Sequence, residues 1–100
     1  MLNNGKRRPT HPGEILREDV FPELGISQGE FAKMLGVTRR TVNEILQERR
    51  AISVDMAHRL ARALSTSPEV WLRLQQDVDI WDAMLEHKEE YQRIKPLVAA

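Results

Sequence analysis

The feature that most restricts the fold is a two-residue turn between two amphipathic segments near the middle of the chain. Apolar residues recur at helical spacing over residues 28–35 and again from Thr38 to about Glu48, and only Gly36 and Val37 separate the two segments. Glycine readily adopts the left-handed conformation that ends a helix, and so short a turn makes the next helix cross the first steeply. The pattern predicts a helix-turn-helix.

Small and apolar residues at defined positions favour this motif over an ordinary helical hairpin. Ala32 is small where the second helix is expected to cross the first, and Val37 is placed to fill the angle between them. Val42 and Ile45 are positioned to anchor the second helix on the core. A hairpin within a bundle would account for the apolar positions, but it would not explain the spacing of Ala32 and Gly36.

Helix-start signals recur along the whole chain, whereas the alternation typical of strands is absent. A first helix is expected to open around Pro12, to be interrupted by Pro22 and to end at Gly25. Hydroxyl residues are then placed to cap four further helices, the last reaching Tyr91: Ser27, with Glu30 in a capping box, Thr38, Ser53 and Ser67. The sequence predicts an all-α, five-helix domain over residues 11–91, between a flexible basic arm (1–10) and a tail (92–100).

Charge is balanced over the 100 residues but unevenly distributed. Residues 1–62 carry 11 Lys and Arg against 8 Asp and Glu, and residues 63–100 carry 4 against 7. The chain has no cysteine, which excludes disulfides, thiolate zinc sites and cysteine nucleophiles and agrees with a cytoplasmic protein. No stretch approaches the roughly 20 apolar residues of a membrane helix, and the polar, basic N-terminus does not resemble a secretion signal.

The exposed face of the second motif helix carries side chains that can read bases. At about 100° per residue, the face opposite Val42 and Ile45 holds Arg40, Glu44 and Gln47, with Asn43 beside it. In the major groove, arginine pairs with guanine, asparagine and glutamine pair with adenine, and glutamate accepts from cytosine. A solvated polar face is the alternative. Glu44 follows Arg40 by one turn, so it is placed either to contact a base or to hold the arginine in a reading position.

Residues around this face complete a candidate DNA-binding surface. The side chain of Gln28 and the start of its helix suit a phosphate, as do Arg49 and Arg50, for which simple solubility is the alternative. The predicted DNA contacts are Gln28, Thr38, Arg39, Arg40, Thr41, Asn43, Glu44, Gln47, Arg49 and Arg50.

The last predicted helix carries an apolar stripe that is long for a small domain. Its members recur at intervals of three and four residues and are Trp71, Leu74, Val78, Trp81 and Leu85. The stripe either covers the core of the first four helices or forms, in part, the interface of a two-fold dimer. We expect a homodimer, because one recognition helix reads only a few base pairs.

Nothing in the sequence predicts an enzyme, a metal site or a cofactor. The three histidines, His11, His58 and His87, lie far apart and lack the spacing of metal ligands. The acidic residues between Asp77 and Glu90 fall along a predicted helix surface, and no nucleophile is paired with a base.

Several motifs in order give a family resemblance. Residues 27–48 resemble the helix-turn-helix of lambda-type phage repressors, the broad XRE group. The wider chain is similar to HigA-type antitoxins, through HPGEIL (11–16), LGISQ (24–28), RRTV (39–42), DMA (55–57), RLARAL (59–64) and SPEVWL (67–72). The resemblance covers about residues 10–82, leaving most of the arm and residues 83–100 outside it.

This resemblance implies a lambda-repressor-like fold and a double function. A HigA-type protein is expected to bind an inverted-repeat operator in double-stranded DNA as a homodimer, to repress its own operon, and to neutralise a HigB-type ribonuclease toxin. Two alternatives remain: a stand-alone XRE-type repressor without a toxin, and a protein-binding module whose helix-turn-helix no longer binds DNA.

Overall fold

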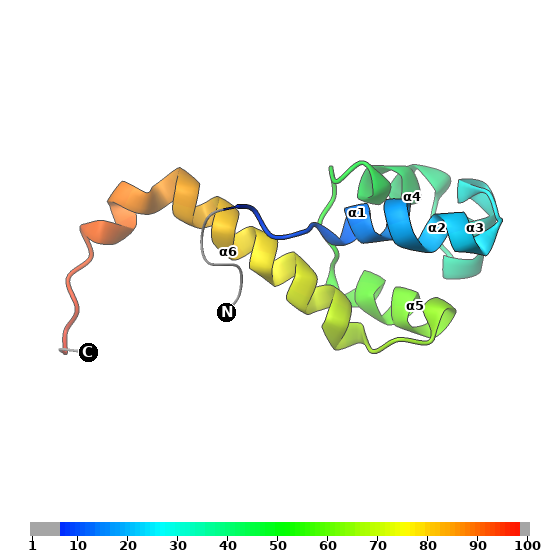
Figure 1. Cartoon of the computed structure of the whole chain (residues 1–100). Helices are drawn as coiled ribbons and strands as arrows, with labels where there is room; N and C mark the ends of the chain where they lie inside the picture. Colours follow the sequence, from blue (N-terminus) through cyan, green and yellow to red (C-terminus); the bar gives the residue numbers. More distant parts are fainter. Residues whose placement is uncertain (1–6, 99–100) are drawn as a thin grey trace.

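The computed structural model describes residues 7–98, and within them every regular element is helical (Figure 1). The elements are α1 (Pro12–Ile15), the π-helix η1 (Leu16–Val20), α2 (Phe21–Leu24), α3 (Gln28–Leu35), α4 (Arg39–Leu46), α5 (Val54–Leu64) and α6 (Pro68–Gln92). Because α1, η1 and α2 follow one another without a break, the described residues form five helical rods. The predicted all-α, five-helix domain is therefore confirmed. None of these helices is long and apolar enough to cross a membrane.

The first rod passes through Pro22 instead of being interrupted there, which corrects the prediction for this residue. Proline lacks an N–H and normally disrupts a continuing helix. Here the preceding turn is wider, and the Phe21 N–H donates to the Leu16 carbonyl five residues back. Pro22 consequently lies in the first turn of α2, where a missing N–H is tolerated. The rod ends at Gly25, which has a left-handed φ of 65°, as predicted.

The predicted caps at the helix-turn-helix are present. The Ser27 hydroxyl accepts from the Glu30 N–H at 3.0 Å, while the Ser27 N–H donates to the Glu30 carboxylate at 2.8 Å. Gly36 ends α3 with a φ of 75°, and the Thr38 hydroxyl accepts from the Thr41 N–H at 3.1 Å to open α4. The turn, and with it the crossing of α3 and α4, is thus fixed by local side-chain and backbone conformations.

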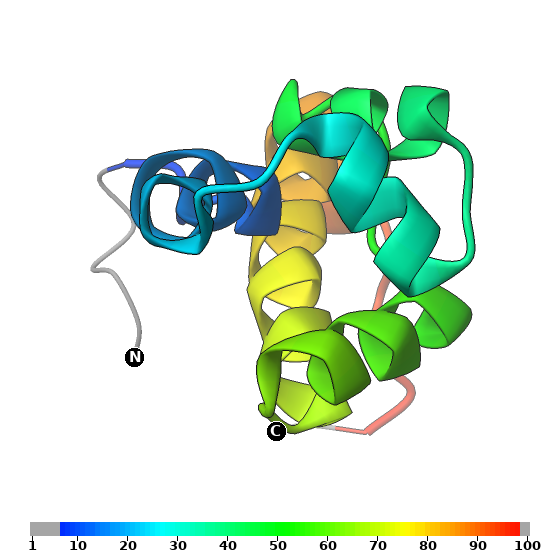
Figure 2. The same cartoon turned by 90° about the vertical axis from the view of Figure 1, so that its right-hand side faces the viewer.

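The core lies where α3, α4 and α5 meet the first rod and the start of α6 (Figure 2). It is built from buried apolar side chains: Leu16, Phe31, Ala32, Leu35, Val42, Ile45, Leu46, Ile52, Met56, Ala57, Leu60 and Trp71. Trp71 is only 4% exposed, and its indole N–H donates to the Thr66 hydroxyl at 2.8 Å. The indole N–H of Trp71 therefore has a hydrogen-bond partner although the ring is buried.

The two halves of α6 differ in their surroundings. The inner half, residues 68–79, packs on the domain and buries Trp71, Gln75 and Val78. The outer half, residues 80–92, extends away from the other helices and makes the described chain 51 Å long and 23 Å wide (Figure 1). Backbone angles leave the helical range once within it, at His87.

Candidate nucleic-acid interface

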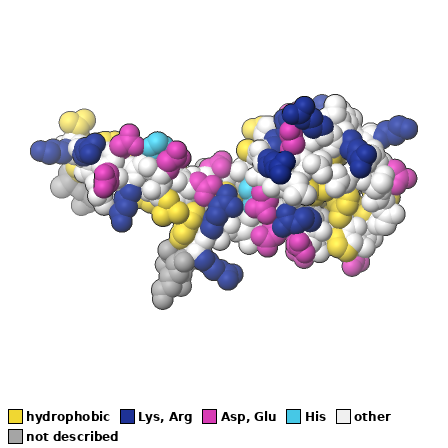
Figure 3. All heavy atoms as spheres, turned by 90° about the horizontal axis from the view of Figure 1, so that it is seen from above, with side chains coloured by type: hydrophobic (Ala, Val, Ile, Leu, Met, Phe, Trp, Pro, Cys, Tyr) yellow, Lys and Arg dark blue, Asp and Glu magenta, His cyan; other side chains and the backbone are white. Residues whose placement is uncertain are grey.

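The recognition helix α4 presents the face that its sequence predicts. Val42, Ile45 and Leu46 are buried, whereas Arg39 and Arg40 are exposed on the other side. Asn43 and Gln47 are exposed as well, and Thr41 is half-buried. Figure 3, which views the molecule from the side on which α4 lies, shows Lys and Arg side chains spread over this end of the domain. The helix thus presents a polar surface to solvent. We call this surface, made of Arg39, Arg40, Asn43, Glu44 and Gln47 with Arg49 and Arg50 just beyond the helix, the ridge.

Glu44 lies at the centre of this ridge and binds two arginines. Arg40 Nε donates to Glu44 Oε2 at 3.1 Å, across one turn of α4. Arg50, which follows the helix, donates to Glu44 Oε1 from Nε at 3.0 Å and from Nη2 at 2.7 Å. Hydrogen bonds from Arg50, and to a smaller extent from Arg40, hold the pKa of Glu44 below its usual value, so the carboxylate is charged at neutral pH. Of the two roles predicted for Glu44, the structure contains the contact with Arg40.

Two further contacts lie at the exposed surface of the motif, and one of them connects its two helices. Asn43 Nδ2 donates to Gln28 Oε1 at 3.2 Å, which joins α4 to the first residue of α3. The Thr38 and Thr41 hydroxyls lie 3.0 Å apart. Gln28 and Asn43 are therefore brought together between α3 and α4, whereas Thr38 and Thr41 pair at the start of α4.

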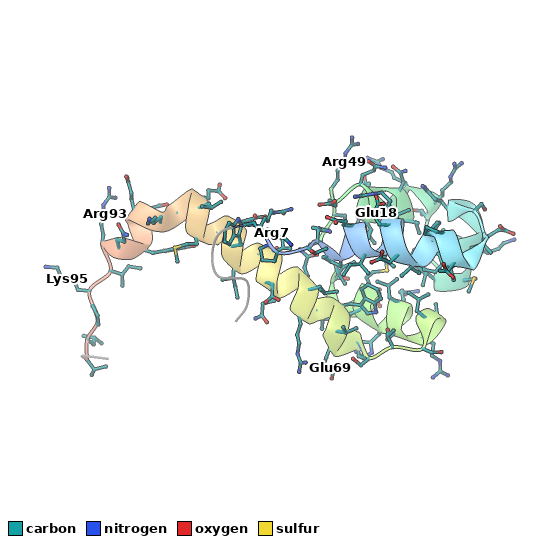
Figure 4. All side chains as sticks on the ribbon, in the orientation of Figure 1. Arg7, Glu18, Arg49, Glu69, Arg93 and Lys95 are labelled. Carbon is teal, nitrogen blue, oxygen red and sulfur yellow. The ribbon has the colours of Figure 1, made fainter. Side chains whose placement is uncertain are left out.

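Arg49 extends from the segment after α4, away from the body of the domain (Figure 4). Its N–H donates to the Glu44 carbonyl at 2.8 Å, so the chain is still held against the helix end at this point. Arg49 and Arg50 stand at the C-terminal end of α4, while Arg39 and Arg40 stand at its start. The ridge thus has basic side chains at both ends.

Sequence reasoning missed the contacts that hold α4 in place from behind. A Cβ on Gly13 would overlap the Ile45 carbonyl oxygen, so only glycine allows α1 to lie this close to α4. Arg17 donates from Nη1 to the Leu46 carbonyl at 2.6 Å and pairs with Glu48 at 3.3 Å. Glu48 has a φ of 62°, which turns the chain sharply after α4. A glycine in the first turn of a predicted helix was the one available signal, because glycine is costly there without a packing reason.

The N-terminal segment is also connected to α6. Arg8 donates to both carboxylate oxygens of Asp82, at 2.9 and 2.8 Å, and lies 3.6 Å from Glu48. The predicted flexible arm falls partly outside the described residues, since the structure describes it only from Arg7 onward. Within that part, Arg8 links the segment before α1, the end of α4 and the outer half of α6.

The five residues predicted for a dimer interface do not share one environment. Trp71 and Val78 are buried within the single chain, at 4% and 1% exposure, so they belong to the monomer core and are corrected as interface residues. Leu74 and Trp81 are half-buried, and Leu85 is 69% exposed. The surface left open on the outer half of α6 also includes Ile80 and Met84, at 61% and 48% exposure.

Away from this surface, titratable side chains form no metal site in the described part of the chain. Within residues 7–98, no three His, Asp or Glu side chains come together as metal ligands. His11 is buried and accepts from the Gly13 N–H at 2.8 Å, which is a cap on α1. Burial lowers the pKa of His11, consistent with a neutral ring serving as acceptor.

Comparisons with known proteins agree with this geometry. A helix-turn-helix family model matches residues 16–71. Antitoxin HigA-1 of Vibrio cholerae serotype O1 is 37% identical over 96 residues, covering 96% of this chain and 90% of its own. An uncharacterized HTH-type transcriptional regulator of Haemophilus influenzae is 39% identical over 87 residues, covering 87% of this chain and 79% of its own. The solved structure of antitoxin GraA in complex with its operator is 48% identical, with a TM-score of 0.85, and covers 99% of this chain and 100% of its own.

Proposed function

Because this chain belongs to the helix-turn-helix family, and within it to the HigA-type antitoxins, we propose that it is a DNA-binding antitoxin that represses its own operon. The observation that carries the proposal is the exposed ridge of α4, with arginines at both ends and amide side chains between them. The likeness over almost the full chain to an antitoxin in complex with its operator supports DNA binding by this chain.

In this proposal α4 lies in the major groove of an operator. The terminal nitrogens of Arg40 pair with guanine, and Asn43 and Gln47 pair with adenine. Gln28 and Arg49 contact phosphates on either side, which positions the domain without selecting a sequence. Arg40 is the strongest candidate for base reading, because its side chain is 85% exposed and held at one point only, by Glu44.

The proposed operator is an inverted repeat bound by a homodimer. The outer half of α6 offers an unpaired apolar surface for two-fold contact, through Trp81, Leu85 and the neighbouring Met84. Exposed apolar side chains gathered on one projecting helix are typical of an interaction surface.

The proposed protein partner is a HigB-type ribonuclease toxin. We expect the toxin to bind a surface other than the α4 ridge, so that neutralisation and DNA reading separate. Co-expression should then protect cells from the toxin encoded next to this gene, including when Arg39 and Arg40 are both replaced by alanine. Loss of protection in this double variant would mean that the toxin uses the ridge.

The DNA proposal is tested by the Arg40→Ala variant. It should fold normally and lose operator affinity by about 1–3 kcal/mol, mainly as lost discrimination against scrambled DNA. Binding to both duplexes is measured at fixed salt, with Arg73→Ala as the matched control, because Arg73 is an exposed arginine on α6. An equal loss on both duplexes would reduce Arg40 to a phosphate contact, and no loss on either would refute base reading by this face.

A stand-alone repressor is the second candidate, and the similarity to a protein named as a transcriptional regulator favours it. Co-purification from the native operon separates the two. An RNA-cleaving partner that co-purifies supports the antitoxin, whereas the absence of any toxic neighbour supports the stand-alone repressor.

A further inference from the structure

The acidic residue at the centre of the basic ridge needs an explanation of its own. Double-stranded DNA is a polyanion, and a carboxylate facing it lowers affinity for every sequence. Glu44 is nevertheless placed among Arg39, Arg40, Arg49 and Arg50, on the surface that the proposed function turns toward DNA. We propose that Glu44 is a specificity-determining residue, which weakens binding to non-operator DNA more than binding to the operator. This inference rests on the proposed function.

The geometry of the two ion pairs supports this role. Arg40 contacts Glu44 only through Nε, which leaves both terminal nitrogens free. Those two nitrogens are the ones that bind guanine O6 and N7 side by side. Arg40 can therefore read a guanine while Glu44 continues to hold it, and the pair is compatible with the operator complex.

Arg50 is held differently. It donates to Glu44 through Nε and Nη2 together, so one edge of its guanidinium is already occupied. For that edge to bind a phosphate, Arg50 must leave the carboxylate. The carboxylate charge would then lose its second partner while lying close to the DNA phosphates.

Operator and non-operator DNA therefore require different changes in the contacts among Glu44, Arg40 and Arg50. On non-operator DNA, affinity comes from arginines that reach phosphates, and Arg50 must first give up the bonds of one guanidinium edge to Glu44 before that edge can do so. On the operator, Arg40 gains a base contact without breaking that bond. Glu44 thus selects against the binding mode that depends on charge alone, while it orients the side chain that reads sequence.

The test compares Glu44→Gln with the wild type on two duplexes. One is the segment that the wild type protects upstream of its own reading frame, and the other is the same duplex with its base order scrambled. The variant should bind scrambled DNA roughly tenfold more tightly, which is close to the strength of one charge interaction that is well screened by water. For scrambled DNA, the slope of log K against log salt concentration should become more negative by about 0.9, which corresponds to one additional phosphate contact. Affinity for the operator should rise by much less, so the ratio of the two affinities falls.

A matched control separates position from net charge. Glu69→Gln removes one carboxylate from the start of α6, on the side of the molecule opposite Arg49 (Figure 4). It should leave the ratio of affinities unchanged. If Glu44→Gln raises affinity for both duplexes equally, or changes the ratio no more than Glu69→Gln does, the inference is wrong.

Glu44→Asp tests orientation apart from charge. The shorter side chain keeps the carboxylate but cannot reach both arginines. The variant should therefore bind scrambled DNA about as weakly as the wild type does, and it should also lose affinity for the operator. An aspartate variant that matches the wild type on both duplexes would contradict the orienting role. Circular dichroism and thermal unfolding confirm that each variant is folded. Failure of the wild type to distinguish the two duplexes would instead refute the proposed function itself.

Discussion

The inner and outer halves of α6 carry the same apolar spacing but meet opposite surroundings. Trp71, in the inner half, is 4% exposed and hydrogen-bonded to Thr66, whereas Leu85, in the outer half, is 69% exposed. Trp81 lies between these extremes. A stripe at helical spacing therefore predicts that one face of a helix is covered, but not which chain covers it. That depends on where the helix leaves its own domain, which is a property of the tertiary structure.

The largest effect is expected from Trp71→Ala, because the inner half belongs to the monomer core. Removing this side chain should lower the free energy of unfolding by about 3–5 kcal/mol. Denaturant unfolding monitored by circular dichroism measures it. Thr66→Val is the control: it removes the hydrogen-bond acceptor of the indole but keeps the packing, so it should cost less, about 1–3 kcal/mol for the unpaired indole N–H. A Trp71→Ala protein as stable as the wild type would remove the distinction between the two halves.

Trp81→Ala should act on association instead of on folding. Burial of a large apolar side chain contributes roughly 1.5–3 kcal/mol, and two-fold symmetry counts it twice. The variant should keep its helical signal, shift toward monomer in sedimentation, and lose operator affinity. Val54→Ala, a truncation of an exposed apolar residue on α5, should change none of these.

Two results would contradict the interface assigned to the outer half. A Trp81→Ala dimer that is as stable as the wild-type dimer would place the interface elsewhere. A Trp81→Ala protein that unfolds would mean that this tryptophan, like Trp71, belongs to the monomer core.

The smallest effect is expected at the junction of the two halves, from Asp82→Asn. The ion pair with Arg8 is solvent-exposed, so its loss should cost about 0.2–1 kcal/mol. The Arg8 guanidinium holds the pKa of Asp82 below its usual value. The contribution of this ion pair to the free energy of unfolding is therefore complete above the ordinary aspartate pKa of about 3.9. It is lost as pH falls through the lower pKa that Asp82 has in the folded state.

Unfolding at several pH values checks this expectation. The difference in the free energy of unfolding between the wild type and Asp82→Asn should be largest at neutral pH and should become smaller in acid. Asp77→Asn, an exposed change on the same helix, should show no such convergence. A difference that grows in acid would be inconsistent with the Arg8–Asp82 pair as its source.

Features encoded within a few residues were predictable from the sequence. The caps at Ser27 and Thr38, the left-handed Gly36 and the exposed face of α4 each depend on neighbours along the chain, and each is present. The pairing of Arg40 with Glu44 belongs to the same class, because one helical turn brings the two side chains together.

Features that depend on distant partners were not predictable. The contact of Gly13 with Ile45 and the bond of Arg17 to the end of α4 join residues far apart in sequence. The second partner of Glu44, Arg50, became visible only with the path of the chain after α4. The division of the α6 stripe likewise required the shape of the domain, since the spacing of the residues is the same on both sides of the boundary.

The projection of α6 from the domain has a geometric consequence. The radius of gyration is 16.3 Å, while a compact chain of this length has about 13 Å. If two copies join through their outer halves, the inner halves act as rigid spacers that fix both the separation and the angular offset of the two recognition helices. Each residue of an α-helix adds about 1.5 Å and turns the face by about 100°. Operator spacing would then be determined by helix length, in whole residues, and independently of the side chains that read the bases.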